Sequence, residues 1–217
     1  ADITLTLMLM AARRAGEGER EVRANKWEGW RPTHLVGTKL TGKTLGIIGF
    51  GRIGQEVAKR AHHGFGMKIL VQNRSSIDPR ILSHTNAVQI DKINDLLPYI
   101  DFLSLHCPGG EENRDLIGSE ELKLMKKESI LINTARGEVV NDNALIYALK
   151  NKIINAAGLD VYNGEPNLNK DYLDCNNAIL LPHLGSATNE TREAMGFRVI
   201  KNLNEFFSGK VPVDKIS

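Results

Sequence analysis

The 217 residues carry 28 basic and 26 acidic side chains, and 41% of them are hydrophobic, as in an ordinary globular protein. A formal net charge of +2 gives no reason to expect nucleic acid or an anionic membrane as a partner. The two cysteines, Cys107 and Cys175, are too few for a disulfide framework, and no apolar run reaches the roughly 18 residues that span a bilayer, so a cytoplasmic protein with reduced thiols is expected.

The first 43 residues differ in character from the rest. Residues 2–24 have a helical pattern that ends in a charged, exposed tail, and residues 25–43 form an arm that contains Trp27 and Trp30. Two Trp side chains in a polar arm need a surface to pack on, either in this domain or across an interface. The chain begins Ala1-Asp2-Ile3 within a helical pattern and without Met, which suggests a piece of a longer protein.

From residue 44 onward, short apolar runs alternate with helical patterns, which predicts a doubly wound parallel sheet. The expected strands are 45–48, 68–71, 102–105, 130–133, 155–159 and 178–181. The expected helices are 52–63, 91–97, 119–126 and 141–149. A last helix is predicted from Thr188, a suitable N-cap, to Ser208, with Gly209 closing it.

Two glycine-rich motifs compete for the role of phosphate site. Residues 37–44 match the nucleotide-triphosphate pattern G-x-x-x-x-G-K-[ST], which requires a strand before it and a helix after it. Here a loop precedes the motif and a predicted strand follows it, so we interpret it as a solvent-facing turn.

The second motif, Gly49-Phe50-Gly51-Arg52-Ile53-Gly54, follows a predicted strand and opens a predicted helix. Gly49 permits the tight turn, Gly51 lets a pyrophosphate approach the backbone, and Gly54 allows the helix to pack on the strand. This setting predicts a Rossmann-type dinucleotide site.

The end of the second predicted strand indicates which dinucleotide is preferred. An NAD site places Asp or Glu about 20 residues beyond the glycines, where it binds the ribose 2′-OH. The chain has Asn73-Arg74-Ser75 there instead, and Arg74 with Ser75 can bind a 2′-phosphate. NADP(H) is therefore favoured, with NAD(H) possible and Arg74 as a plain surface residue the alternative.

Three polar residues follow three other predicted strands, where open α/β sheets bind ligands. Arg136 follows strand 130–133, Glu165 follows strand 155–159, and His183 follows strand 178–181. Hydride transfer to a 2-keto acid requires a cation that binds the substrate carboxylate and a proton donor for the keto oxygen. It also requires a carboxylate that raises the pKa of that donor.

At these residues the chain resembles the D-isomer-specific 2-hydroxyacid dehydrogenases. The resemblance covers essentially the whole chain and is carried by the glycine turn, Asn-Thr-Ala-Arg-Gly at 133–137, Gly-Leu-Asp-Val-Tyr at 158–162, Gly-Glu-Pro at 164–166 and Pro-His-Leu-Gly-Ser-Ala-Thr at 182–188. It implies that Arg136, Glu165 and His183 form the catalytic trio. The Asn73-Arg74 pair is most similar to NADPH-preferring glyoxylate and hydroxypyruvate reductases of the family.

The resemblance also implies a set of cofactor contacts and no metal site. Backbone amides of Arg52 and Ile53 would face the pyrophosphate, and Asp160 would lie near the nicotinamide carboxamide. The full expected set is Gly49, Gly51, Arg52, Ile53, Gly54, Asn73, Arg74, Ser75, Cys107, Pro108, Thr134, Ala135, Arg136, Asp160, His183 and Gly185.

The expected organisation is a dinucleotide-binding domain over residues 1–187 and a C-terminal helix and tail over 188–217. By the resemblance, this helix belongs to a substrate domain that is mostly missing from the chain, and the 1–24 helix and 25–43 arm lie at a homodimer interface. Gly109-Gly110 departs from the bulkier pair usual in the family, which suggests a more mobile loop.

The favoured function is reduction of glyoxylate or hydroxypyruvate, small 2-keto acids, or oxidation of the matching 2-hydroxy acids. Two alternatives stay open from the sequence: phosphoglycerate dehydrogenation, and an NAD(H)-sensing, corepressor-like binding protein on the same fold. Formate dehydrogenases of similar pattern have Gln where Glu165 stands, which disfavours that activity.

Overall fold

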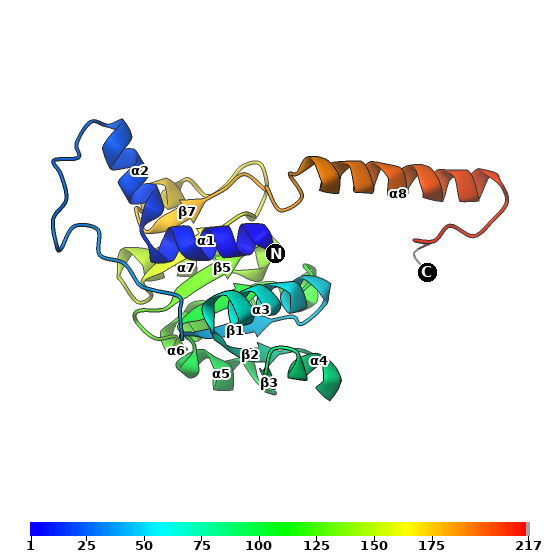
Figure 1. The fold of residues 1–217 in the computed structure, drawn as a ribbon, viewed down its shortest axis with the longest axis horizontal. Coiled ribbons are helices and arrows are strands. Elements are labelled where there is room, and N and C mark those ends of the chain that lie inside the picture. Colours follow the sequence, from blue (N-terminus) through cyan, green and yellow to red (C-terminus); the bar gives the residue numbers. More distant parts are fainter. Residues whose placement is uncertain (216–217) are drawn as a thin grey trace. The chain divides into compact units, whose positions relative to one another are not determined.

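The computed structural model describes residues 1–215, and its centre is a seven-stranded parallel sheet in the order β3-β2-β1-β4-β5-β6-β7 (Figure 1). The strands are β1 Thr44–Ile48, β2 Lys68–Gln72, β3 Val88–Gln89, β4 Phe102–Leu105, β5 Ile130–Asn133, β6 Ala156–Leu159 and β7 Ala178–Leu180. All six pairings are parallel, which confirms the doubly wound sheet. The chain turns from one half of the sheet to the other between β1 and β4, where such sheets bind dinucleotides.

Helices cover both faces of the sheet, which explains why its strands are nearly continuous apolar runs. The buried sides of α1 (Asp2–Ala12) and α3 (Arg52–Phe65) belong to one hydrophobic cluster. Those of α5 (Ile93–Leu96), α6 (Ser119–Leu124) and α7 (Asp142–Lys150) belong to a second one. Each fully buried Leu, Ile or Val in these clusters stabilises the fold by about 1.5–3 kcal/mol relative to an exposed side chain.

The single helix predicted over residues 2–24 is wrong, because the structure contains two helices there. α1 ends at Ala12, where the apolar pattern ends, and α2 runs over Ala15–Arg23. Between them Arg14 adopts a left-handed conformation (φ 53°), and its guanidinium binds Glu17 at 2.7 and 2.8 Å in the first turn of α2. The tail is exposed as predicted, since no described residue of α2 is buried.

Two short elements beyond β2 were not predicted. α4 (Pro79–Ser83) has a readable start, because the Asp78 side chain accepts a hydrogen bond from the Arg80 amide at 2.8 Å and proline occupies the first turn. β3 has only two residues, and its Val88 is exposed, so it lacks the apolar run on which the prediction of strands depends.

Short 3-10 helices occupy parts of the loops. They are η1 Leu97–Tyr99, η2 Glu111–Asn113, η3 Gly137–Val139 and η4 Lys170–Asp174. The helix predicted over 91–97 is α5 followed by η1, with Pro98 in the 3-10 turn. The site loops described below include η2 and η3.

Residues from Leu184 onward form a second compact unit, separate from residues 1–183. Its helix α8 (Asn189–Phe207) begins as predicted, with the Thr188 side chain accepting a hydrogen bond from the Thr191 amide at 3.2 Å. Ser208 ends the helix and Gly209 follows with φ +71°. Among the residues described, no helix is long and apolar enough to cross a membrane.

Candidate functional site

The glycine turn lies at the carboxyl end of β1, against the loop that follows β4. Gly49 has φ +87°, and a Cβ added there would lie 2.6 Å from the amide nitrogen of Cys107 and 2.7 Å from the carbonyl carbon of His106. Only glycine fits this position without moving one of the two strand ends. The turn therefore stays close to the point where the strand order reverses.

The next residues form a cradle for an anion. Gly51 is the N-cap of α3, no side chain caps the helix in the described part of the chain, and no described atom lies within 4 Å of a Cβ added at Gly51. Arg52 and Ile53 in the first turn are exposed. Uncapped amides at a helix N-terminus attract phosphate, so these residues fit the pyrophosphate of a dinucleotide.

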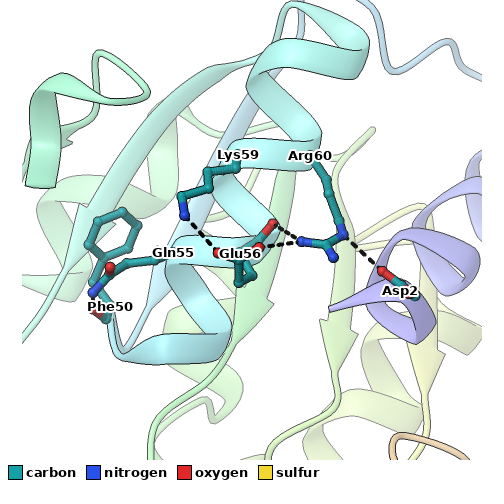
Figure 2. A network of polar contacts seen from close by, with 6 residues as sticks. All are labelled: Asp2, Phe50, Gln55, Glu56, Lys59 and Arg60. Atoms are coloured by element: carbon teal, nitrogen blue, oxygen red, sulfur yellow. Dashed lines mark hydrogen bonds and ion pairs between the residues drawn. The ribbon is translucent and has the colours of Figure 1, made fainter. Parts of the chain in front are cut away.

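Two amide side chains bind the backbone carbonyl and the backbone amide of Phe50 in the glycine turn. Gln55 donates from Nε2 to the carbonyl oxygen of Phe50 at 3.1 Å, and Figure 2 shows this side chain lying alongside Phe50. Asn73, after β2, accepts a hydrogen bond from the amide of Phe50 at 3.2 Å. Because both backbone groups of Phe50 are bonded, the glycine turn is pre-organised.

The outer side of α3 carries a charged network that reaches α1 (Figure 2). Arg60 binds Glu56 at 2.7 Å and Asp2 at 2.8 Å, and Lys59 binds the other oxygen of Glu56 at 2.7 Å. All of these side chains are exposed, and exposed pairs contribute only about 0–1 kcal/mol each. The network links the start of α1 to the middle of α3 and contributes little to stability.

The end of β2 holds the residues predicted to select the cofactor. Asn73 donates from Nδ2 to the carbonyl and hydroxyl oxygens of Ser75, both at 3.1 Å. The Arg74 side chain is 72% exposed, and its Nη1 lies 3.8 Å from Oε1 of Glu112. Glu112 comes from the loop after β4 and was not among the predicted site residues.

The residues at the end of β5 are held by hydrogen bonds to one another, and Asn133 among them is buried. Asn133 is 1% exposed; its Oδ1 accepts from the Ala135 amide at 3.0 Å and its Nδ2 donates to the carbonyl of Arg136 at 2.9 Å. Arg136 donates from Nη1 to the carbonyl of Ala135 at 2.7 Å. Asn133 was not predicted as a site residue and appeared only as part of the Asn-Thr-Ala-Arg-Gly motif. A polar residue at the end of a buried strand is nevertheless a sequence signal for a side chain that holds the following loop.

The structure brings Glu165 and His183 together at the ends of the next two strands. Oε2 of Glu165 lies 2.7 Å from Nδ1 of His183, and Oε1 accepts a hydrogen bond from the Tyr162 amide at 2.9 Å. Tyr162 in turn donates from its hydroxyl to the carbonyl of Leu181 at 2.9 Å. Both carboxylate oxygens are therefore engaged, and the imidazole has a fixed partner on one nitrogen.

The charges around Glu165 keep its carboxyl group ionised. Burial acts to raise its pKa, but the hydrogen bonds from His183 and the Tyr162 amide, together with the charges of His183 and Arg136, bring the pKa below its usual value. Arg136 thus acts electrostatically on the Glu165 carboxylate, which is bonded to His183.

Other predicted cofactor positions surround these strand ends. The Thr134 hydroxyl lies 3.0 Å from that of Thr4, and the Asp160 amide donates to the carbonyl of Asn133 at 3.0 Å. Burial raises the pKa of the Cys107 thiol, which suits a contact residue better than a nucleophile. Gly185 belongs to the unit that starts at Leu184, and its role stays a prediction.

His106 follows β4 and lies beside the glycine turn, where its side chain is partly buried. Its Nε2 lies 2.8 Å from the hydroxyl of Ser104, and burial lowers the pKa of His106 to about 4. The imidazole is therefore neutral near pH 7.

The competing motif at residues 37–44 is not a phosphate loop. Its last residue, Thr44, begins β1, and the Gly42 amide donates to the carbonyl of Phe65 at 3.2 Å, beside the end of α3. A strand follows the motif, as the sequence predicts, so its amides do not continue into a helix N-terminus.

Comparison with known proteins agrees with this arrangement. The family model described as "D-isomer specific 2-hydroxyacid dehydrogenase, NAD binding domain" matches residues 5–185. The chain is 47% identical over its whole length to a glyoxylate reductase of Thermococcus litoralis, of which it covers 66%, and 40% identical over 96% of its length to a glycerate dehydrogenase of Hyphomicrobium methylovorum, of which it covers 65%.

A solved structure gives the same result. An NADPH-dependent glyoxylate/hydroxypyruvate reductase from Sinorhizobium meliloti matches all of this chain with a TM-score of 0.88 and 30% identity, over 66% of its own length. The chain thus spans just under two thirds of the length of these relatives. It belongs to the D-isomer-specific 2-hydroxyacid dehydrogenases, and the matched part is their NAD(P)-binding domain.

Proposed function

We propose that the protein transfers a hydride between NADP(H) and a small 2-keto or 2-hydroxy acid, with glyoxylate or hydroxypyruvate as the keto acid. The observation that carries this proposal is the Glu165–His183 pair, 2.7 Å apart, at the same edge of the sheet as the glycine turn. The names of the glyoxylate reductase and glycerate dehydrogenase relatives support the substrate class.

His183 is the proposed acid and base of the reaction. The bound nicotinamide supplies the hydride to C2 of the keto acid, or accepts it in the reverse direction. His183 gives a proton from Nε2 to the carbonyl oxygen in reduction and takes it back in oxidation. Glu165, bonded to Nδ1, orients the ring and stabilises its positive charge.

Arg136 is the proposed ligand of the substrate carboxylate. Its guanidinium is exposed, and its backbone is fixed by the buried side chain of Asn133. The planar fork of arginine matches a carboxylate and also polarises the neighbouring keto group. These roles, like the cofactor contacts expected from the sequence, are proposals.

Arg74 and Ser75 are the proposed ligands of the cofactor 2′-phosphate. No carboxylate stands directly at the end of β2, and the NADPH-dependent relative from Sinorhizobium meliloti has the same fold. Arg74→Gln is expected to weaken NADPH binding about tenfold or more while NADH binding changes little, because a charge-assisted bond to phosphate is lost. An equal effect on both nucleotides would contradict the assignment.

We also propose a homodimer formed through the cofactor domain (residues 1–187), with residues 188–217 belonging to the substrate half. Trp27 and Trp30 are 56% and 82% exposed, so they do not pack inside the described subunit. Large exposed aromatic side chains are typical of interfaces. A monomer in solution would contradict this proposal.

A substrate panel tests the activity directly. The intact protein is assayed with glyoxylate, hydroxypyruvate and pyruvate, each with NADPH and with NADH in parallel. We expect turnover of glyoxylate or hydroxypyruvate with NADPH the better cofactor. Faster turnover with NADH would overturn the NADP(H) assignment, and cofactor binding without any turnover would overturn the enzymatic function.

A further inference from the structure

The loop after β4 brings a carboxylate to the residue proposed to select the cofactor. Oε1 of Glu112 lies 3.8 Å from Nη1 of Arg74, and the two side chains are 56% and 72% exposed. The two residues follow β4 and β2, which are the two neighbours of β1 in the sheet. The pair therefore lies at the carboxyl end of β1, where the glycine turn begins. The acidic residue that the end of β2 lacks is thus supplied by a different strand end.

The position of Glu112 depends on the double glycine that precedes it. Gly110 has φ +111°, a conformation that L side chains rarely adopt, and a Cβ there would lie 2.8 Å from Oε2 of Glu112. The Gly110 amide also donates to Oε1 of Glu138 at 3.3 Å, which ties the loop to η3. Gly110 therefore leaves space that the Glu112 carboxylate occupies.

The neighbouring glutamate provides a contrast within the same turn. Glu111 binds Arg114 at 2.7 Å, three residues along the chain, whereas Glu112 reaches Arg74. Two adjacent carboxylates of equal charge thus have different partners. Only Glu112 is paired with a residue of the proposed cofactor site.

We propose that Glu112 is a specificity-determining residue that weakens the binding of NADP(H) relative to NAD(H). This rests on the proposed function of Arg74 as ligand of the 2′-phosphate. The phosphate carries a charge near −2 at neutral pH, so it is repelled by the Glu112 carboxylate and competes with it for Arg74. NAD(H) has a neutral 2′-hydroxyl at that position and meets neither cost.

The test is a binding titration that requires no turnover. NADPH and NADH are titrated into the wild-type protein, Glu112→Gln, the matched control Glu111→Gln, and Arg74→Gln. At low salt we expect Glu112→Gln to bind NADPH about five- to tenfold more tightly and NADH within about twofold of the wild type. Glu111→Gln is expected to bind both nucleotides as the wild type does.

Salt separates an electrostatic effect from a change in loop structure. Screening at about 0.5–1 M salt should reduce the gain in NADPH affinity of Glu112→Gln to about twofold. A gain of equal size at high salt, or equal gains for NADPH and NADH, would overturn the proposal.

The Arg74 variant distinguishes the two proposals. If Arg74→Gln weakens NADPH binding and Glu112→Gln leaves it unchanged, the inference on Glu112 is overturned and the role of Arg74 stands. If Arg74→Gln leaves NADPH binding unchanged, the 2′-phosphate assignment fails and the inference on Glu112 fails with it.

Discussion

The ends of β5 and β2 are built from the same kind of residue and are held in different ways. The Asn133 and Asn73 side chains each accept a hydrogen bond from a backbone amide and donate one to a nearby backbone carbonyl. Asn133 is buried, whereas Asn73 is followed by exposed residues, with the Arg74 side chain 72% exposed. One strand end is fixed by buried hydrogen bonds and the other by hydrogen bonds near the surface.

This contrast matches the two tasks that we propose for the site. In the proposed reaction, the end of β5 holds Arg136 in one place relative to the Glu165–His183 pair. The buried side chain of Asn133, which is hydrogen-bonded to the backbone of the following loop, keeps that loop in place. The end of β2 only has to present groups to one end of the cofactor, where an ion pair with Glu112 can form or break at little cost. We therefore expect substitutions at the end of β5 to affect stability and those at the end of β2 to affect cofactor choice.

The largest expected effect comes from Gly137→Ala. A Cβ at Gly137 would overlap the backbone of Tyr162 and Asn163, which no side-chain rotation can relieve. We expect a loss of about 3 kcal/mol or more in the free energy of unfolding, measured by urea denaturation. Gly64→Ala in α3 is the control: it has open space, and we expect it to be neutral or to stabilise by about 0.5–1 kcal/mol. Equal stabilities for the two variants would show that the end of β5 is not tightly packed.

Asn133→Ala should be the next most damaging change. It removes two hydrogen bonds and leaves the Ala135 amide without its buried acceptor. The expected loss in unfolding free energy is about 2–3 kcal/mol, again by urea denaturation. A loss below about 1 kcal/mol would mean that water replaces the side chain, contrary to its burial.

His106 gives a pH dependence with a defined sign. Burial lowers its pKa from 6.5 to about 4, so between these values the unfolded chain binds more protons than the folded one. Its contribution to stability is fully present above pH 6.5 and is lost as the pH falls toward 4, by about 2–3 kcal/mol. Unfolding free energies at pH 7, 5.5 and 4.5 measure this. His106→Gln should have a flatter profile over this range, and an unchanged slope would contradict the assignment.

Asn73→Ala is expected to have the smallest effect on stability. Its hydrogen bonds lie near the surface, where water can replace them, so the loss should be about 1 kcal/mol or less. Because Asn73 also fixes the amide of Phe50, the affinity for both NADPH and NADH should fall together, as titration would show. A larger loss of stability than that of Asn133→Ala would reverse the comparison.

The elements buried on both faces could be predicted from the sequence. β4 and β5 have the predicted bounds, because short and mainly apolar runs between turns leave little choice of strand bounds. Arg14 could not be identified as a break, since arginine is a good helix former and only the end of the apolar pattern at Ala12 indicated one. β3 could not be predicted, because a strand of two residues, neither of them buried, leaves no periodic pattern in the sequence.

The candidate site shows the same limit. Arg136, Glu165 and His183 each follow a predicted strand, and parallel strands place such residues at one edge, so their proximity was predictable. The pairing of Glu112 with Arg74 was not, because it depends on the path of the loop through Gly110. Sequence patterns locate strand ends, whereas contacts between two loops depend on backbone angles within them.

The most direct test of the account is His183→Ala in the intact protein. We expect kcat/KM for glyoxylate or hydroxypyruvate to fall by about 10²- to 10⁴-fold, because the proton donor is lost, while the Kd for NADPH stays within about twofold. Turnover within about threefold of the wild type would contradict the assignment of His183, and with it the proposed hydride-transfer site.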